Sequence, residues 1–468
     1  MITEKIRQNA LRYPERIAYS CDGRSITCDR LWSDACGYAE HLKRITCSPV
    51  IICANKSPET ITAVTACLIA GLPYIPVDPS ITLPRLEDII SVSGAEILIS
   101  EEKLPVSAYC CSLEELPLCE KQAGGVYRGD TAYIIFTSGS TGVPKGVPVS
   151  KDSLENFVSW LSSLSPLDGY RDITVMNQAS FAFDLSVADL YYSLCCGHTL
   201  ISSEETLPEN YDSVLSSLKT AHFSVMTPSF MRMLLLEKSF AAESFPLLDC
   251  VFFCGERLDV PTAKKLLKRF SGIHIINAYG PTEAACAVCS VEITEEIIKK
   301  YPVLPVGEIS GAAAQITVEK GEIVLKGKSV FSGYLGGESG GYFKENGVNC
   351  FRTGDIGEIE NGLLFCGGRR DNLIKINGFR VEPEDIENNI CRIPGVEQCC
   401  VVPVYGRNNE VRSMTAFVAA EKDLTGEYIR QELKELLPYY MIPSKIRFME
   451  SLPLTKNGKT DRKKLMKL

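Results

Sequence analysis

The sequence Thr137-Ser-Gly-Ser-Thr-Gly-Val-Pro-Lys-Gly146 directly follows the apolar run Ala132 to Phe136. The apolar run predicts a buried strand, because short apolar runs bounded by turn residues are typical of strands inside parallel sheets. Three glycines allow the following loop to turn tightly and to approach a ligand. Hydroxyl groups and a lysine can then surround a polyphosphate. The residues expected to contact phosphate are Thr137, Ser138, Gly139, Ser140, Thr141, Gly142 and Lys145.

This loop differs from a Walker A loop, in which a Gly-Lys pair is followed by serine or threonine at the start of a helix. Here Pro144 precedes Lys145, and Gly146 follows it. The alternative without a ligand is a flexible turn rich in serine and glycine. The loop by itself therefore favours phosphate binding but does not identify the class of enzyme.

The sequence before the loop alternates between apolar runs and amphipathic segments. Val50 to Ile52 and Ile97 to Ile99 are short apolar runs that predict buried parallel strands. Apolar residues between positions 31 and 42 recur at helical spacing, and Thr27 stands where a helix cap is expected. This alternation is typical of an α/β fold.

The sequence after the loop changes character twice. From about Pro302 to Gly368 it contains short strand-like runs and many glycines, which predict a small barrel-like or antiparallel section. After Asp371 follows a compact α/β segment of roughly one hundred residues, near the lower end of domain sizes. The expected fold class is α/β, with a large N-terminal domain at 1–370 that holds two α/β layers and the β-barrel-like section. The expected C-terminal domain is small and occupies 371–468.

Length and charge exclude several classes of protein. The chain has 468 residues, which is more than one hydrophobic core usually absorbs, so at least two domains are expected. Its net charge of -9 argues against a general nucleic-acid binder, because neutralising phosphates requires a basic face. The first ten residues lack the apolar core of a signal peptide. The uncharged stretch Ile61 to Val77 is interrupted by glycine and prolines, so it predicts a buried helix, a turn and a strand rather than a membrane span.

Twenty cysteines are scattered along the chain. Without a secretory signal, this pattern predicts reduced thiols in the cytoplasm that act mostly as small core residues. Cys286-Ala-Val-Cys289 has the spacing of a metal or redox pair, which is an alternative. The sequence contains four histidines in all and no second pair of this kind. The Cys286–Cys289 pair also lies in an apolar, strand-like run. A structural role is therefore favoured for both thiols.

Seven further motifs accompany the phosphate loop along the chain. They are Leu68-Ile-Ala-Gly-Leu-Pro-Tyr-Ile-Pro-Val-Asp78, Phe183-Asp-Leu-Ser186, Asn277-Ala-Tyr-Gly-Pro-Thr-Glu283, Phe351-Arg-Thr-Gly-Asp355, Gly368-Arg-Arg-Asp371 with Lys375-Ile-Asn-Gly-Phe-Arg380, Leu437-Pro-Tyr-Tyr-Met-Ile-Pro443 and Asn457-Gly-Lys-Thr-Asp-Arg462. With the loop, they resemble the adenylate-forming ligases, the superfamily of nonribosomal peptide adenylation domains, acyl-CoA synthetases and luciferases. The resemblance spans almost the whole chain. It implies that the protein condenses a carboxylic acid with ATP to give an acyl-adenylate and pyrophosphate.

The resemblance implies a role for each residue of the ATP site. Tyr279 is expected to stack on adenine, and Asp355 to accept both ribose hydroxyls with Arg369 nearby. Glu283 and the hydroxyl of Thr282 are expected to face Mg²⁺ and the α-phosphate, since a hard cation prefers oxygen ligands. A core tyrosine and a turn aspartate are the structural alternatives for Tyr279 and Asp355. The other nucleotide contacts implied by the motif are Asn277, Ala278 and Gly280.

The resemblance also implies a catalytic lysine on a moving domain. Lys459 is expected to reach the carboxylate and the α-phosphate, where its charge would stabilise the attack of oxygen on phosphorus. Alone, a lysine in a basic tail would be interpreted as solvated surface. Asp371 is implied as the hinge about which the mobile C-terminal domain rotates between two half-reactions, because such positions absorb a change of backbone angles.

Asp184 indicates the class of acid. In this family an aspartate after phenylalanine binds the α-ammonium group of an amino acid, whereas a carboxylate buried against a fatty or aryl acid would have no partner. The structural alternative is a helix N-cap, because Asp184 precedes the helix-like segment Leu185 to Leu194. The other pocket positions implied by the family carry no charge, so the substrate side chain should be small and uncharged. These positions are Leu185, Ala188, Val225, Phe252, Cys254, Ala278, Cys286 and Ala287.

The run Phe252-Phe-Cys-Gly-Glu256 narrows the range of expected substrates further. It is similar to the D-alanine:carrier-protein ligases, which start teichoic-acid D-alanylation, whereas peptide-synthetase domains usually have glycine or alanine in place of Cys254. Phe365-Cys-Gly-Gly-Arg369 points to the same subfamily. Against it, the chain is somewhat short, and Cys286 stands where an aliphatic residue is expected. D-alanine is therefore the preferred substrate, and glycine, L-alanine or L-serine in a nonribosomal peptide-type pathway are alternatives.

The sequence contains no segment expected to form a carrier domain, so the resemblance implies transfer to the phosphopantetheine thiol of a separate carrier protein. A CoA ligase for a small acid is the alternative within enzymes, and Asp184 argues against it. A non-catalytic ATP-binding sensor is the alternative of another class. Lys459, Glu283 and Lys145 argue against a sensor, because it would not need a lysine for adenylate formation.

Overall fold

The computed structural model describes residues 1–119, 123–139, 142–203, 211–337, 340–376, 378–406, 410–420, 424–454 and 460–468. The chain divides into two compact units. The first unit consists of Met1–Pro79, Ser93–Ile135 and Val147–Arg370. The second consists of Ser80–Val92, Phe136–Gly146 and Asp371–Leu468. The phosphate-loop segment thus groups with the C-terminal part of the chain, and the domain boundary after residue 370 stays a prediction.

The largest sheet of the first unit has eight strands. Their order is β14 (Cys289–Glu292), β13 (His274–Tyr279), β12 (Cys250–Phe253), β11 (Phe223–Met226), β9 (Thr174–Asn177), β10 (Thr199–Ser202), β1 (Ile17–Cys21) and β2 (Arg24–Thr27). The pairs from β13 to β1 are parallel, whereas β14 and β2 pair antiparallel at the two edges. The carboxyl ends of β9, β11, β12 and β13 therefore meet at one edge, which is where open α/β sheets bind ligands.

A second sheet has the order β6 (Tyr109–Cys111), β5 (Ile97–Ser100), β3 (Val50–Cys53), β4 (Tyr74–Val77), β7 (Thr131–Thr137) and β8 (Lys145–Ser150). β3 lies between β4 and β5 and pairs in parallel with both. All four residues of β3 and of β5 are buried, which confirms the two strands predicted from apolar runs. β7 contains the apolar run 132–136, so the phosphate loop begins at the end of a strand as predicted.

A third sheet covers the glycine-rich section. Its order is β15 (Gly307–Glu308), β20 (Leu363–Arg369), β19 (Val348–Glu360), β17 (Glu322–Lys326) and β16 (Gln315–Glu319), and β18 (Tyr342–Glu345) also pairs with β19. All of these pairs are antiparallel, as predicted. β15 and β16 stand at opposite ends of the order, so the described strands form an open sheet rather than the barrel-like ring that was the other expectation.

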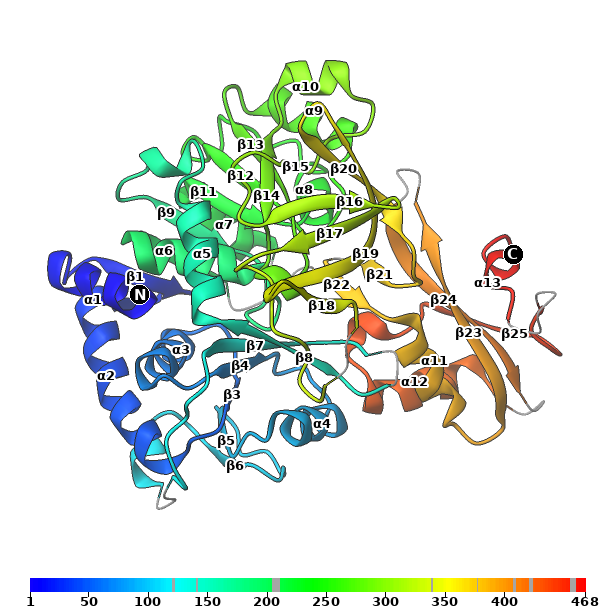
Figure 1. The fold of residues 1–468 in the computed structure, drawn as a ribbon, viewed down its shortest axis with the longest axis horizontal. Coiled ribbons are helices and arrows are strands. Elements are labelled where there is room, and N and C mark those ends of the chain that lie inside the picture. The colour runs from blue at the N-terminus through cyan, green and yellow to red at the C-terminus, as the bar shows by residue number, and fades with distance from the viewer. Residues whose placement is uncertain are drawn as a thin grey trace. The chain divides into compact units, whose positions relative to one another are not determined.

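The C-terminal segment of the second unit contains a hairpin and a three-stranded sheet. The hairpin is β21 (Ile374–Ile376) with β22 (Phe379–Val381), and the sheet has the order β23 (Val396–Tyr405), β24 (Val411–Ala420) and β25 (Lys445–Phe448). Helix α11 packs against β23, and α12 packs against β25 (Figure 1). Buried aliphatic residues of these elements form a core of their own, which agrees with the compact α/β segment predicted after Asp371.

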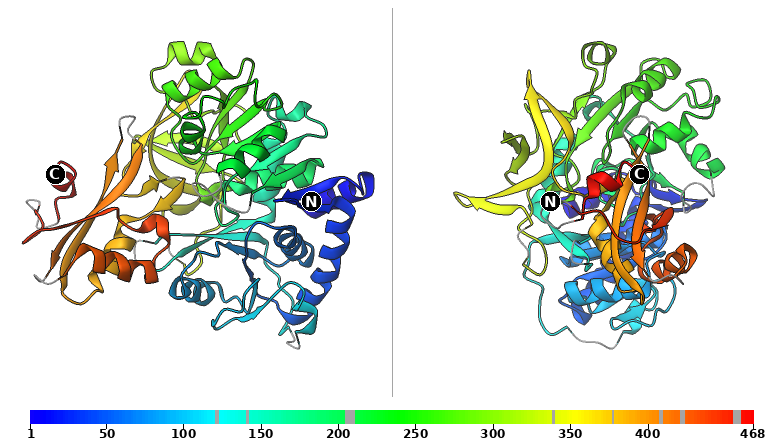
Figure 2. Two further views of the ribbon diagram at one scale, coloured as in Figure 1. Left: turned by 180° about the vertical axis from the view of Figure 1, so that it is seen from behind. Right: turned by 90° about the vertical axis from the view of Figure 1, so that its right-hand side faces the viewer.

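The helices are α1 (Ile2–Arg12), α2 (Cys28–Ile45), α3 (Pro58–Ala70), α4 (Leu83–Ser93), α5 (Lys151–Leu161), α6 (Ser186–Cys196), α7 (Tyr211–Thr220), α8 (Pro228–Leu234), α9 (Val260–Arg269), α10 (Glu295–Lys300), α11 (Pro383–Cys391), α12 (Gly426–Leu436) and α13 (Arg462–Leu465). Thr27 caps α2 as predicted, because its hydroxyl accepts the Arg30 N–H at 3.3 Å. α2 packs against α3, and α1 packs against α2 and α6 (Figure 2).

The uncharged stretch at 61–77 forms the helix, turn and strand that the sequence predicts. Gly71 ends α3 with a φ of 77°, a left-handed conformation that favours glycine. β4 follows directly. Within the residues that the structure describes, no helix combines the length and the apolar composition needed to cross a membrane.

Candidate active site

Tyr279, Asp355 and Arg369 come together in the first unit. Tyr279 is the last residue of β13, and its hydroxyl donates to Oδ2 of Asp355 at 2.6 Å. Asp355 and Arg369 are cross-strand partners on β19 and β20, and the Arg369 guanidinium donates to Oδ1 of Asp355 at 2.7 Å. Burial, followed by the charge of Asp355, raises the pKa of Tyr279 well above its usual value, so the phenol stays a donor. The three residues therefore form one hydrogen-bonded group that joins β13 of the eight-stranded sheet to β19 and β20 of the antiparallel sheet.

The motif that follows β13 supplies two more predicted residues. Thr282 and Glu283 lie in a short 3-10 turn, Thr282–Ala284, and the Glu283 side chain is fully buried. Tyr334 donates its hydroxyl to Oε1 of Glu283 at 2.5 Å, and the backbone N–H of Phe331 donates to the Glu283 carbonyl. Sequence reasoning assigned no role to Tyr334. The signal available was its place in the Phe331-Ser-Gly-Tyr334 run, but nothing in that run identifies its partner.

Glu283 fits the chemistry expected of a Mg²⁺ ligand. Among the described residues no group of three or more His, Cys, Asp or Glu side chains is arranged to hold a metal by itself. Mg²⁺ in nucleotide enzymes is usually held by one or two carboxylates together with substrate phosphates and water. A single buried carboxylate beside the nucleotide motif is therefore compatible with a metal that arrives with ATP.

Asp184 lies in the connection between β9 and α6. Its side chain is 9% exposed, and Oδ2 accepts a hydrogen bond from the Thr282 hydroxyl at 2.6 Å. The residue that caps α6 is Leu185, and no side chain caps that helix. The N-cap alternative for Asp184 is therefore wrong. Thr282, expected to face phosphate, donates to this carboxylate and so links the nucleotide motif to Asp184.

The other predicted pocket residues lie in one buried, largely apolar cluster of the first unit. Val225 and Phe252 are register partners on β11 and β12, at the carboxyl ends of these strands. Tyr133 belongs to the same cluster, and its hydroxyl has no hydrogen-bond partner among the described residues. Burial raises the pKa of Tyr133 well above its usual value. The predicted members of the cluster are Leu185, Ala188, Val225, Phe252, Cys254, Ala278, Cys286 and Ala287.

Cys286 occupies a tight turn rather than the strand-like run expected from its apolar neighbours. β14 begins only at Cys289, and Ala285 and Cys286 have φ values of 58° and 76°. The Ala287 N–H donates to the Ala285 carbonyl at 3.0 Å, which closes a γ-turn centred on Cys286. The Cys254 thiol donates to the Cys286 carbonyl at 3.7 Å. Strained backbone of this kind persists where its surroundings hold it, and here the Cys254 thiol is one such contact.

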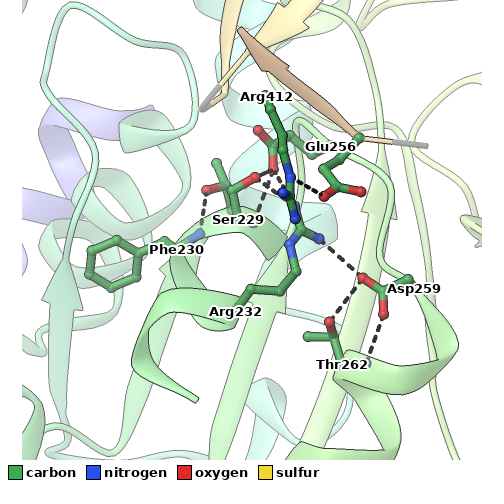
Figure 3. A network of polar contacts seen from close by, with 9 residues as sticks. Ser229, Phe230, Arg232, Glu256, Asp259, Thr262 and Arg412 are labelled. Carbon is green, nitrogen blue, oxygen red and sulfur yellow. Dashed lines mark hydrogen bonds and ion pairs between the residues drawn. The ribbon is translucent and has the colours of Figure 1, made fainter. Parts of the chain in front are cut away.

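A polar network holds the chain that follows Cys254 (Figure 3). Arg232 on α8 donates to Oδ2 of Asp259 at 3.1 Å and lies 3.8 Å from Oε2 of Glu256. Ser229 donates its hydroxyl and its backbone N–H to Glu256, and Asp259 caps α9 by accepting the Thr262 N–H at 2.8 Å. Because Glu256 is two residues beyond Cys254, this network anchors the loop at the end of β12. Sequence reasoning did not identify it.

Two further residues of the nucleotide motif, Asn277 and Gly280, have structural roles. Asn277 donates its amide to the Pro305 carbonyl at 2.7 Å, and its Oδ1 has no hydrogen-bond partner among the described residues. A Cβ atom at Gly280 would lie 2.5 Å from Cα of Ala287, so only glycine fits there. Gly280 thereby allows the turn around Cys286 to approach the end of β13.

The phosphate loop belongs to the second unit. The Ser138 hydroxyl donates to the Arg380 carbonyl at 3.0 Å and accepts the Glu382 N–H at 2.9 Å. Nζ of Lys145 lies 3.7 Å from Oε1 of Glu382. Asp371, the predicted hinge, accepts the Leu373 N–H at 3.3 Å and is exposed. Three predicted site residues lie outside the described part of the chain, namely Ser140, Thr141 and Lys459.

Two family models match the chain. The model for AMP-binding enzymes matches residues 6–335, and the model for the AMP-binding enzyme C-terminal domain matches residues 385–459. Together they cover most of the sequence, including the phosphate loop and the motif around Tyr279.

Curated relatives match over almost the full length. A D-alanine–D-alanyl carrier protein ligase of Bacillus licheniformis is 36% identical over 496 aligned residues, which cover 99% of this chain and 98% of the relative. A protein of the same name from Listeria monocytogenes is 37% identical over 503 residues, with the same coverage.

Solved structures share the fold at lower identity. The adenylation domain AlmE of Vibrio cholerae, in complex with glycyl-adenosine-5'-phosphate, has a TM-score of 0.84 at 23% identity and covers 100% of this chain and 97% of its own. PA1221, a nonribosomal peptide synthetase protein with adenylation and PCP domains, has a TM-score of 0.82 at 22% identity and covers 100% and 84%. At this identity the likeness extends to the fold alone. From the family models and the full-length relatives it follows that the chain belongs to the AMP-binding enzyme family and is an adenylate-forming ligase.

Proposed function

We propose that this ligase activates D-alanine with ATP and then transfers the alanyl group to the phosphopantetheine thiol of a separate carrier protein. The observation that carries the proposal is Asp184, a buried carboxylate that accepts a hydrogen bond from the Thr282 hydroxyl. A buried carboxylate requires a partner, and the α-ammonium group of an amino acid supplies one without further protein charge. The relatives at 36% and 37% identity, which are named for this reaction, support it.

In this proposal the polar group around Asp355 binds the nucleoside. Asp355 accepts the ribose hydroxyls, Arg369 holds that carboxylate in place, and the Tyr279 ring lies against adenine. Lys145 and the hydroxyls of the phosphate loop bind the triphosphate. Glu283 binds the Mg²⁺ that accompanies ATP, which neutralises charge on the phosphates.

The amino-acid carboxylate attacks the α-phosphorus, and pyrophosphate leaves. Lys459 stabilises the charge that develops between carboxylate and phosphate. Residues 371–468 form the mobile domain, with Asp371 as its hinge, and their rotation removes Lys459 before the carrier thiol attacks the adenylate. The reaction takes place in the cytoplasm, and the alanyl carrier supplies the D-alanylation of cell-wall teichoic acid.

A carrier-loading assay tests the proposal. Holo-carrier protein, ATP, Mg²⁺ and radiolabelled D-alanine are incubated with the enzyme, and label bound to the carrier through a thioester is measured. We expect loading that requires both ATP and the phosphopantetheine arm. Loading of free coenzyme A in preference to the carrier would favour a CoA ligase, and absence of ATP turnover with any acid would favour a sensor.

The predicted pocket residues suggest a test of which alanine enantiomer the enzyme prefers. Asp184 and Lys459 fix the ammonium and carboxylate groups of the substrate, so the remaining question is where the methyl group points. We expect Cys254 to fill the space that an L-methyl group would enter. Cys254→Ala should improve activation of L-alanine and narrow the D/L ratio of kcat/KM by about tenfold, because one methyl group in an apolar pocket changes the rate by roughly 10- to 200-fold.

The control for this prediction is Cys250→Ala. Cys250 is the first residue of β12, whereas Cys254 directly follows the last residue of that strand, and both side chains are buried. The control variant should leave the D/L ratio unchanged. An unchanged ratio in Cys254→Ala as well would mean that Cys254 is only a small core residue.

A further inference from the structure

Glu382 lies against the cation of the phosphate loop. Its Oε1 is 3.7 Å from Nζ of Lys145, and the two side chains are 12% and 17% exposed. Both residues belong to the second unit. Lys145 is the cation that the loop is expected to offer to a polyphosphate, so a protein carboxylate already pairs with that cation. Sequence reasoning assigned no role to Glu382.

The ion pair is part of a larger set of contacts on both sides of Glu382. The Ser138 hydroxyl accepts the Glu382 N–H at 2.9 Å and donates to the Arg380 carbonyl at 3.0 Å. The start of the loop is thus attached to the end of β22, next to α11. The Ser138 hydroxyl is therefore already engaged in contacts within the protein, as is the ammonium group of Lys145.

Arg85 connects the middle of the loop to α11. Its guanidinium donates to the Gly142 carbonyl at 3.0 Å and to Oδ2 of Asp385 at 2.9 Å. The Arg85 and Asp385 side chains are 8% and 0% exposed, so the pair is shielded from water. Asn389 donates to the Asp385 backbone carbonyl and to Oδ1 of Asp385. A buried, doubly hydrogen-bonded arginine of this kind fixes geometry, so the loop and the start of α11 are held in one arrangement.

Lys145 and Arg380 both favour the charged form of Glu382 against the effect of burial. Burial raises the pKa of Glu382, and the charges of Lys145 and then Arg380 lower it. Two anions cannot share one partly buried lysine without strong mutual repulsion. A triphosphate on the loop is therefore expected to compete with the Glu382 carboxylate, 3.7 Å away, for Lys145.

We propose that Glu382 is an internal counter-anion that competes with the triphosphate and with pyrophosphate for Lys145. This role of Glu382 rests on the proposed function and extends it to the steps of turnover. ATP displaces Glu382 when it binds, and Glu382 returns to Lys145 when pyrophosphate leaves. Its return lowers the affinity for pyrophosphate and so opposes the reversal of adenylation. Glu382 is a positioning residue in this account, because it acts through Lys145 and not on the reacting atoms.

The size of the effect follows from the population of the ion pair. A ligand that binds only the open state has its apparent affinity reduced by the fraction of molecules that are open. If about one molecule in ten is open, affinity is about tenfold weaker than in a protein without the competing charge. Glu382→Gln should therefore bind ATP and inorganic pyrophosphate about 3- to 10-fold more tightly than the wild type.

The test is calorimetric titration of the full chain with ATP and with inorganic pyrophosphate, without amino acid. Glu384→Gln is the matched control, because Glu384 lies on α11 and pairs with Arg462 at 3.2 Å instead of Lys145. It removes the same charge and should leave both affinities unchanged. In a Lys145→Ala background, Glu382→Gln should have no effect, since the two residues act through one interaction. If Glu382→Gln does not fold, Glu382→Asp, which withdraws the carboxylate, should shift binding in the same direction.

Unchanged or weaker binding by Glu382→Gln would overturn the proposal, as would an equal effect of Glu384→Gln or an effect that persists in Lys145→Ala. The readout needs neither the amino acid nor the carrier. A failure to load D-alanine would therefore contradict the proposed function while leaving this inference standing, and unchanged nucleotide affinity would do the reverse.

Discussion

Replacing Lys459 by alanine is expected to slow adenylation by about 10²- to 10³-fold, the loss typical of removing one group that stabilises charge in the transition state. The lysine is expected to act where the substrate carboxylate and the α-phosphate, both negative, approach each other. The measurement is the rate of ATP–pyrophosphate exchange at saturating D-alanine. Lys463→Ala is the control, because it removes a cation from the same basic stretch and should leave exchange nearly unchanged.

The same variant separates the two half-reactions. Transfer from a preformed alanyl-adenylate to the carrier should be slowed far less than adenylation, because the proposed rotation of the C-terminal domain would have moved Lys459 away by then. Single-turnover transfer with synthetic adenylate measures this directly. Equal losses in both half-reactions would contradict the rotation.

Replacing Asp184 by alanine is expected to lower kcat/KM for the amino acid by roughly 10- to 150-fold. A hydrogen bond to a charged group contributes about 1.5–3 kcal/mol, which corresponds to a change of this size. ATP affinity should stay nearly the same, because no nucleotide contact is expected at Asp184. The effect should appear mainly as a higher KM for the amino acid, measured in the exchange assay.

Asp184→Asn is the matched variant, because it keeps the size of the side chain and removes its charge. It should resemble Asp184→Ala if charge pairing with the ammonium is the cause. A wild-type enzyme that prefers propionate to alanine, or an Asp184→Ala enzyme with full amino-acid turnover, would show that the class of acid is wrong.

The elements that the sequence predicted well depend on local signals. β3 and β5 were visible because both faces of an inner parallel strand are buried, which requires an unbroken apolar run. The turn at Cys286 was missed because its residues are as apolar as those of a strand. Its shape depends on the close approach of Gly280 and on the Cys254 thiol, and neither contact is local in sequence.

The candidate active site likewise combines residues that local motifs predict with contacts that only the tertiary fold creates. Motif order selected Tyr279, Asp355 and Arg369, and the structure places these three in one hydrogen-bonded group, while their nucleotide-binding roles stay predictions. The partners of the phosphate loop were not predictable, because Arg85 and Asp385 are 300 positions apart and neither lies in a motif that specifies the other. Pairings of this kind follow from the tertiary fold and leave no periodic or compositional trace.

The most direct test of the account is ATP–pyrophosphate exchange with the wild-type enzyme across a panel of acids. The panel contains D-alanine, L-alanine, glycine, L-serine and propionate, each at several concentrations, so that kcat/KM is obtained for every acid. The account predicts the highest kcat/KM for D-alanine, with L-alanine lower by about 10- to 200-fold, the range for a misplaced methyl group. Propionate should support almost no exchange, because it lacks the ammonium group that we propose Asp184 binds. Exchange that is strongest with propionate, or equal for the two alanine enantiomers, would contradict it.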